Sequence, residues 1–403
     1  MEHAFDRQTD RQTDRQTDRA EIGKGEEGRE KSGIAAAQHL SPTSESKPTA
    51  IARKSNIELL RIVAMVLIVM HHYAVHGGWA LTPDFTFSKY FLQIFSFGGK
   101  VGVDIFILIT GYFMIHSAFK PEKLVKLVGQ IWFYGLVILG FACFKHLDTV
   151  NFGNAIQSII PLGQTSWFAY TYLVMYLFIP VLNPCIKALS KEQLRKVLTL
   201  STVLWFVIPT FWNIWPKLPW LDFCFSSLLL FFYLYGLGAY IRLYGESLNP
   251  RGTVRLIAAG FAGILAGYLL IDLVAIHHHS FMARMFYFSG DNLFTLLIGT
   301  GLFLYFRKLD ISYSSVINKI AATTFGIYLI HDSNLLRPYL WHHVFHNAGY
   351  LNSAWLPVHA VSTVLIVFIV GAVIDFCRKK FIEKPITRVI KQSHILGKIP
   401  HLQ

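Results

Sequence analysis

Cysteine is scarce in this chain of 403 residues, and the few cysteines lie far apart. There are four, each in or beside an apolar run: Cys143, Cys185, Cys224 and Cys377. A zinc site would need cysteines at short spacing, and a disulfide framework would need an even set in a small secreted domain. The cysteines therefore predict neither kind of site.

Long polar stretches are missing after residue 54, so no soluble domain of useful size is expected there. Hydrophobic residues make up 53% of the chain. They form successive runs of about 20 residues, the length that an α-helix needs to cross the hydrocarbon of a bilayer. We predict an all-α, multi-pass transmembrane bundle of about ten helices, because only helices and closed barrels satisfy their backbone groups in lipid. The runs are 56–76, 98–117, 124–146, 167–187, 196–215, 222–243, 254–276, 289–306, 319–341 and 355–377.

The first 50 residues lack an apolar run of any length that could build a core. They are of low complexity and include the four-residue repeat "DRQTDRQTDRQTDR". Such a segment cannot bury enough surface to fold, and it lacks the apolar stretch of a secretory signal peptide. We expect residues 1–50 to be a disordered tail, residues 51–392 to form the transmembrane domain, and residues 393–403 to be a short cytoplasmic tail.

Acidic residues are fewer than basic ones, 24 against 37, and the formal net charge is +13. Residues 1–54 contain ten of each sign, so the excess belongs to the membrane part. Nucleic-acid binding is the usual interpretation of such an excess. Here the positive-inside bias of membrane proteins explains it better: with a cytoplasmic N-terminus, 22 basic residues fall in inner segments and six in outer ones. We predict that both termini are cytoplasmic and that the protein has no nucleic-acid partner.

The first apolar run carries ionisable residues in a regular pattern and reads "ELLRIVAMVLIVMHHY" from residue 58 to residue 73. At about 100° per residue, Arg61 and His72 lie about 20° from alignment on one helix face, roughly 16 Å apart along the axis. Glu58 falls on the same side, whereas His71 points about 80° away. Ionisable residues in a membrane helix normally face a cavity or a partner. We predict a polar stripe of Glu58, Arg61 and His72; the alternative is that these residues lie in the two headgroup layers.

An arginine, ten residues and a histidine in the first helix resemble the membrane-integral acyltransferase-3 family. These bacterial enzymes move acyl groups, often acetyl, to cell-surface glycans. Further segments resemble the family's signatures in the expected order: "ELLRIVA" (58–64), "GVDIFILITGYFM" (102–114), "WFAYTYLVMYLFIPVLN" (167–183), "FGIYLIH" (325–331) and "FIEKP" (381–385). The second of these has Thr110-Gly111 in place of the usual Ser-Gly. The resemblance covers about residues 55–390.

This resemblance implies an O-acyltransferase of the bacterial cytoplasmic membrane. The expected reaction moves an acyl group, most often acetyl in the family, from acyl-CoA to a hydroxyl of a surface glycan or its lipid-linked precursor. Acyl-CoA would be a co-substrate, no cofactor would be bound, and membrane lipids would surround the protein. A surface-polysaccharide exporter is the alternative, because a polar path at the midplane also suits a transporter. A small-molecule permease is a third class. We find no inverted repeat and no paired broken helices, which favours the enzyme.

Acyl transfer to a sugar hydroxyl needs a base, and histidine exchanges a proton near neutral pH. His72 is our candidate for this base, and the resemblance implies the same residue. Asp104 and His331 are expected at a similar depth, in the outer half of the bilayer. We expect Asp104 to orient the His72 ring and to stabilise its protonated form. The alternatives are an outer-interface charge for Asp104 and an interhelical hydrogen bond for His331.

A CoA donor carries phosphates, which cations at the cytoplasmic end of the stripe could bind. Arg61, Lys123 and Lys126 are the candidates. Many family members have Arg-x-x-Arg where this chain has Lys123 and Lys126, and lysine offers charge without the bidentate fork of arginine. For the two lysines, the alternative is that they only mark the cytoplasmic side.

Two further residues are supporting candidates. Trp167 lies at a segment end, where an aromatic belt is expected and sugar stacking is the alternative. Glu383 lies in "FIEKP" and is expected to cap the helix end or to pair with Lys379 or Lys380.

Histidines at 277–279 and the pair His342/His346 have a spacing that metal ligands use. The glutamate that follows the first histidine of a zinc-protease helix is missing. We therefore expect solvated histidines in outer loops and no metal site.

Overall fold

The computed structural model describes residues 54–160, 166–215, 218–245, 249–278 and 284–385. The tails expected at 1–50 and 393–403 lie outside these residues. Within the described ranges the chain is helical and contains no strand, and eight helices are long and apolar enough to cross a membrane. The all-α, multi-pass prediction is therefore confirmed. Which side of the membrane each terminus occupies stays a prediction.

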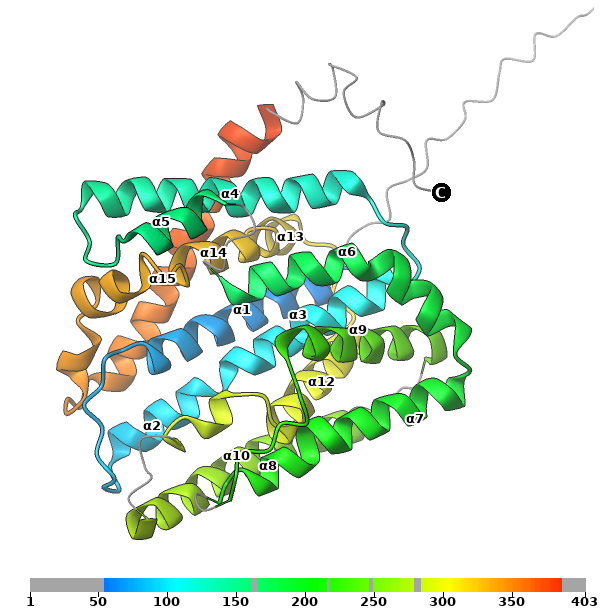
Figure 1. Ribbon diagram of the computed structural model, residues 1–403, viewed down its shortest axis with the longest axis horizontal. Coiled ribbons are helices and arrows are strands. Elements are labelled where there is room, and N and C mark those ends of the chain that lie inside the picture. The colour runs from blue at the N-terminus through cyan, green and yellow to red at the C-terminus, as the bar shows by residue number, and fades with distance from the viewer. Residues whose placement is uncertain (1–53, 161–165, 216–217, 246–248, 279–283, 386–403) are drawn as a thin grey trace, which may run out of the picture. The chain divides into compact units, whose positions relative to one another are not determined.

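Figure 1 shows the eight spanning segments, most of which match a predicted run to within a few residues, whereas the helix Phe87–Ser96 lies outside the predicted runs. They are α1 (Ser55–Val75), α2 (Phe87–Ser96) continued by α3 (Gly98–Met114), α4 (Pro121–Phe144), α6 (Trp167–Ala188), α7 (Lys191–Thr202) continued by η1 (Val203–Val207) and α8 (Ile208–Trp212), α9 (Ser227–Tyr244), α10 (Pro250–His278), and α15 (Leu356–Arg378) continued by η5 (Lys379–Glu383).

The other two predicted runs form shorter helices. One is α12 (Leu293–Lys308), which begins at an Asn292 capping box. The other is divided into α13 (Ser315–Ala321), α14 (Thr324–His331) and the π-helix η3 (Tyr339–Val344). Short elements complete the described chain: α5 (Phe152–Ile159), η2 (Tyr287–Ser289) and η4 (Asn347–Tyr350).

The break between α13 and α14 has a local cause. The hydroxyls of Thr323 and Thr324 donate to the carbonyls of Ile320 and Ala321, at 2.7 and 2.9 Å. Such side-chain bonds compete with the helical ladder. In a membrane, non-helical backbone is tolerated where protein or a water-filled cavity meets it. Here Ala322 and Thr324 at the break line a cavity within the bundle.

Helix α1 lies at the centre of the bundle, beside α3 and in contact with α2, α12, α13, α14 and α15 (Figure 1). Glycines allow α3 to approach its neighbours closely. A Cβ atom at Gly102 would lie 2.6 Å from the Ala64 carbonyl oxygen of α1. A Cβ atom at Gly111 would meet the backbone of Tyr235 in α9. Small residues at helix interfaces serve this purpose in membranes, so α1 is held by close backbone packing.

Candidate active site

A cavity of about 300 Å³ lies between α1, α3, α4, α6 and the break before α14. A second cavity of about 310 Å³ adjoins it and shares Arg61, Thr110, Leu127 and Tyr172 in its lining. We call these two cavities together the cleft. Its walls are mostly apolar, and the charged residues that line it are Arg61, Lys123 and Lys379.

The face of α1 predicted to be polar is the face that lines the cleft. Arg61, Met65 and Ile68 line it, and His72 comes next at the same helical spacing. Tyr328 also lines the first cavity, and its ring centre is 6.4 Å from that of His72. Glu58 lies beside Arg61, with 3.9 Å between their charged atoms. The stripe therefore runs from Arg61, which lines the cleft, to His72, which lines neither cavity and lies beyond the wall residue Tyr328.

The neighbouring histidine, His71, points elsewhere. Its Nδ1 lies 2.6 Å from the backbone carbonyl oxygen of Ser96 in α2. Because a carbonyl can only accept, the ring must donate there. A Cβ atom at Gly99 would meet this ring, so the side chain fills the space beside α3. His71 thus joins α1 to the α2–α3 segment.

His72 and His331 form a buried pair with assigned hydrogen-bond directions. His331 Nδ1 lies 2.6 Å from the carbonyl oxygen of Ile327 and must donate to it. When the His331 ring is neutral, its Nε2 is then an acceptor. His72 Nδ1 lies 2.9 Å from that atom and donates to it. The Nε2 of a neutral His72 is consequently unprotonated and free to take a proton.

Asp332 faces this unprotonated nitrogen. Its Oδ1 lies 3.5 Å from His72 Nε2 and 3.0 Å from an Arg337 nitrogen, and the aspartate is 2% exposed. Two acceptors so close repel each other unless a proton lies between them. Protonation of His72 would replace that repulsion with attraction. The carboxylate therefore favours the protonated ring, acting at the nitrogen that takes the proton.

Asp104 does not occupy the place predicted for it. It lies on α3 about 200° around the helix from Phe106, which lines the cleft. Its side chain packs against α12, where a Cβ atom at Gly299 would be 2.9 Å from the Asp104 Cβ. Both of its oxygens are buried and have no hydrogen-bond partner among the described residues. The carboxylate at His72 is Asp332, so the predicted pairing of His72 with Asp104 is wrong.

The opposite end of the cleft carries cations. Arg61 lines both cavities, Lys123 lines the second, and Lys379 of η5 lines the first. Lys126, the third predicted donor ligand, lines neither cavity. It lies on the α4 face turned to η5, and its amine is 3.8 Å from a Glu383 oxygen. The structure thus gives Lys379 the position predicted for Lys126.

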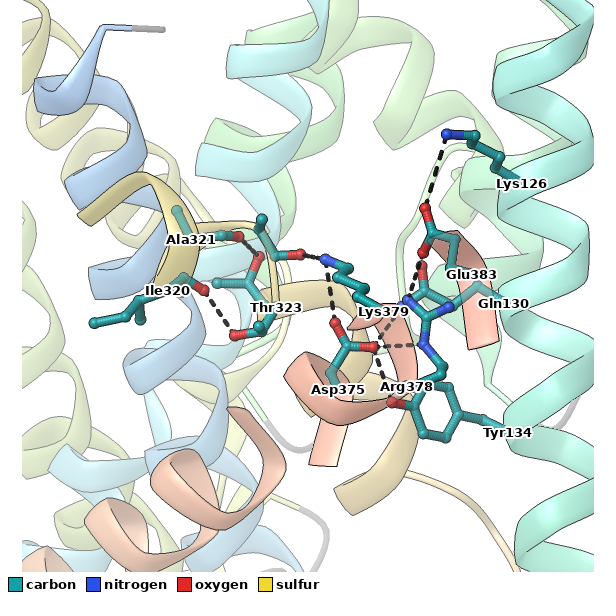
Figure 2. Close-up of polar contacts among 12 residues, drawn as sticks. Lys126, Gln130, Tyr134, Ile320, Ala321, Thr323, Asp375, Arg378, Lys379 and Glu383 are labelled. Carbon is teal, nitrogen blue, oxygen red and sulfur yellow. Dashed lines mark hydrogen bonds and ion pairs between the residues drawn. The ribbon is translucent and has the colours of Figure 1, made fainter. Parts of the chain in front are cut away.

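Figure 2 shows how Lys379 is held. Its amine donates to the Ala322 carbonyl at the helix break and lies 3.2 Å from Asp375 Oδ2. Asp375 is fully buried, and its Oδ1 accepts three hydrogen bonds, from Gln130 at 3.2 Å, Tyr134 at 2.8 Å and Arg378 Nε at 2.8 Å. A buried carboxylate with this many donors is firmly placed. It fixes Lys379 at the edge of the cleft.

The two supporting candidates have defined partners. Glu383 lies 3.0 Å from an Arg378 nitrogen, five residues earlier, and near Lys126. The predicted pairing with Lys379 or Lys380 is wrong because η5 is a π-helix, in which residues five apart are neighbours. Trp167 has the Lys100 amine 4.3 Å from its ring centre and packs against Phe168, a residue of the cleft wall.

Among the described residues, His342 and His346 do not belong to a group of three close ligand atoms. His342 Nε2 lies 3.0 Å from the carbonyl oxygen of His76 and donates to it, so this nitrogen is occupied. At 277–279, side chains are outside the described part of the structure. His72, His76 and Asp332 do bring three ligand atoms within 4.8 Å of one another. Asp332 Oδ1, one of these three ligand atoms, is already paired with Arg337 at 3.0 Å.

Three residues of the site were not predicted to belong to it from the sequence: Asp332, Arg337 and Lys379. The signal for Asp332 was its place directly after His331, with an arginine five residues further on. The signal for Lys379 was its position four residues after Asp375, a carboxylate in the last apolar run. Both signals are oppositely charged residues four or five positions apart, Asp332 with Arg337 and Asp375 with Lys379. Such pairs are common in sequences, so by themselves they do not identify a site.

A bundle of membrane-spanning helices with an internal cleft, cations in its wall and a buried histidine pair beside it has the parts of a membrane-embedded group-transfer enzyme. The family model Acyl_transf_3, described as an acyltransferase domain, matches residues 54–374. The chain belongs to this acyltransferase family and is a multi-pass membrane acyltransferase. No curated protein and no solved structure matches it.

Proposed function

We propose that the protein transfers an acyl group, acetyl in the simplest case, from acyl-CoA to a hydroxyl of a surface glycan or its lipid-linked precursor, in the bacterial cytoplasmic membrane. One observation carries the proposal. A single cleft contains Arg61 and Lys379 at one end and reaches Tyr328, beside His72, at the other. Arg61 and His72 are roughly 16 Å apart along α1, which is comparable to an extended pantetheine arm.

In this mechanism the cations bind the phosphates of CoA, and the thioester extends toward His72. His72 Nε2 takes the proton of the acceptor hydroxyl as its oxygen attacks the thioester carbonyl carbon. Asp332 stabilises the protonated ring, while His331 keeps the ring oriented through Nδ1. The C–S bond then breaks, an ester forms, and the proton on His72 passes to the CoA sulfur. The base is restored, and no cofactor is consumed.

The donor contacts give the first prediction. Arg61→Ala is expected to weaken acetyl-CoA binding by roughly tenfold to a hundredfold, because a hydrogen bond to a charged group contributes about 1.5–3 kcal/mol. Lys379→Ala should fall in the same range, since Lys379 lines the same cavity. Arg61→Lys should restore only part of the affinity because the planar fork is lost. Isothermal titration of purified protein with acetyl-CoA measures all three.

Lys380 provides a matched control for Lys379. It is the next residue, it is exposed, and its amine lies over the Phe381 ring and not in the cleft. Lys380→Ala and Lys126→Ala should bind acetyl-CoA almost as well as the wild type. If Arg61→Ala and Lys379→Ala also keep full affinity, the anionic end of the donor binds elsewhere.

The enzyme and the exporter predict different glycans in living cells. Without the acyltransferase, mass spectrometry should find surface polysaccharide of normal length and amount that has lost its O-acyl groups. An exporter mutant would accumulate glycan inside the cell and lose it from the surface. The second pattern would contradict the proposal. Cells with His72→Ala should match the deletion strain, because only the chemistry is removed.

A further inference from the structure

A pocket with an aromatic and acidic lining shares no residue with the cleft. It has a volume of about 250 Å³ and lies between η1, the turn after α8, and η2. Aromatic rings and carboxylates make up much of its wall, among them Trp205, Trp220, Tyr287, Asp222 and Asp291. Its volume is below the range of about 300–1,000 Å³ usual for drug-sized ligands, so it suits one small ring.

The pocket wall is held by hydrogen bonds within the protein. The Asn213 side chain clamps the backbone of Leu221, donating to its carbonyl at 2.8 Å and accepting from its N–H at 2.9 Å. The Tyr287 hydroxyl donates to the Pro209 carbonyl at 2.9 Å. Asp222 accepts from the backbone N–H of Cys224 at 3.0 Å. A wall fixed in this way is preorganised, which lowers the cost of binding.

The turn beside Asp222 also has an unusual backbone. Phe223 and Cys224 have φ angles of 49° and 57°, in the left-handed region that residues other than glycine rarely adopt. Two such residues in a row turn the chain sharply after Trp220 and Asp222. Strained turns of this kind occur at binding sites more often than elsewhere.

The lining excludes the two most obvious membrane ligands. An acyl chain would suit an apolar wall, such as the cavity beside Val316, Ile320 and Val373. A phosphate needs available cations, and none of the residues lining the aromatic pocket is basic. The nearby Lys100 and Arg284 are held by Asp291 and by the Asn213 carbonyl. A sugar ring fits both features that are present. Its C–H faces pack on the negative faces of Trp and Tyr, and its hydroxyls donate to carboxylates.

A series of contacts connects this pocket to the cleft. Asp291 forms an ion pair with Lys100 at 2.9 Å, and the Lys100 amine lies 4.3 Å from the Trp167 ring centre. Trp167 packs on Phe168, which lines the cleft and contacts Tyr328. We infer that the pocket binds a sugar residue of the acceptor glycan and so holds the chain near the cleft. This inference rests on the proposed function for the identity of the acceptor.

The test uses oligosaccharides released from the de-O-acylated surface polysaccharide of cells that make the protein. Purified protein is titrated with them by calorimetry, without acyl-CoA. Trp220→Ala should weaken binding by about two- to tenfold, the effect of losing one aromatic contact. Trp220 is 64% exposed, so the fold should survive. In turnover assays the KM for oligosaccharide should rise equally, with kcat and the KM for acetyl-CoA unchanged.

Trp215→Ala is the matched control, because Trp215 is 48% exposed and does not line the pocket. It should bind the oligosaccharides like the wild type. Equal affinities for Trp220→Ala and the wild type would overturn the inference. Displacement by choline would point to a cation site, and displacement by phosphatidylethanolamine vesicles to a headgroup site; either result also overturns it. Oligosaccharide binding without any acyl transfer would instead contradict the proposed function and leave this inference standing.

Discussion

Replacing His72 by alanine is expected to abolish acyl transfer while the protein still inserts and binds acetyl-CoA. A positioned general base contributes roughly 10²–10⁴-fold to a rate. His72 is the residue whose Nε2 is left unprotonated by the hydrogen bonds of its neighbours, and it lies beside Tyr328, a residue of the cleft wall. Radiolabelled acetyl transfer by purified protein, with acetyl-CoA affinity measured in parallel, separates loss of chemistry from loss of binding.

His71→Ala is the control, because it removes an imidazole from the adjacent residue. His71 bonds to the Ser96 carbonyl and does not face the cleft. This variant should lose some stability and keep most of its activity per folded molecule. If His71→Ala is inactive and His72→Ala is active, the assignment of the two helix faces is wrong.

Asp332→Asn is expected to have the second-largest effect. The amide keeps the shape of the carboxylate and loses the charge that stabilises protonated His72. A carboxylate on the opposite ring nitrogen of a catalytic histidine contributes up to roughly 10⁴-fold to kcat, whereas Asp332 faces the reacting nitrogen Nε2 itself. We expect kcat to fall by about a hundredfold or more, with the KM for acetyl-CoA nearly unchanged. A merely structural role for Asp332 would reduce the amount of folded protein and not kcat per molecule.

Asp104→Asn makes the same chemical change at the carboxylate that the sequence predicts beside His72. Asp104 is buried against α12 and faces away from the cleft. Its replacement should leave kcat within a few-fold of the wild type. A collapse of kcat in Asp104→Asn, with normal turnover in Asp332→Asn, would restore the sequence-based assignment and reject ours.

The carboxylate beside His72 is Asp332, and the sequence predicted Asp104 instead. The face shared by Arg61 and His72 could be predicted, because helical periodicity within one segment fixes it. Asp104 was chosen by depth in the membrane, and depth does not say which way a side chain points around its helix. Asp332 reaches His72 only because α14 packs beside α1, a contact between segments about 260 residues apart in the chain.

Lys379 and Lys126 show a second limit. Both are lysines near the predicted cytoplasmic end, and charge counting treats them alike. Their positions differ because α4 turns Lys126 toward Glu383, whereas Asp375 and the Ala322 carbonyl draw Lys379 to the cleft (Figure 2). The helix break that exposes this carbonyl was predicted as part of one continuous run. Hydropathy does not detect it, since the residues on both sides are apolar.

The central claim is that one cleft holds the donor's phosphates at Arg61 and Lys379 and its thioester beside His72. A structure of the protein with a non-hydrolysable acetyl-CoA analogue tests this most directly. We expect the phosphates within hydrogen-bond distance of Arg61 and Lys379, and the acetyl carbonyl next to His72 Nε2. An analogue bound outside the cleft, or bound with its phosphates at the His72 end, would contradict the account.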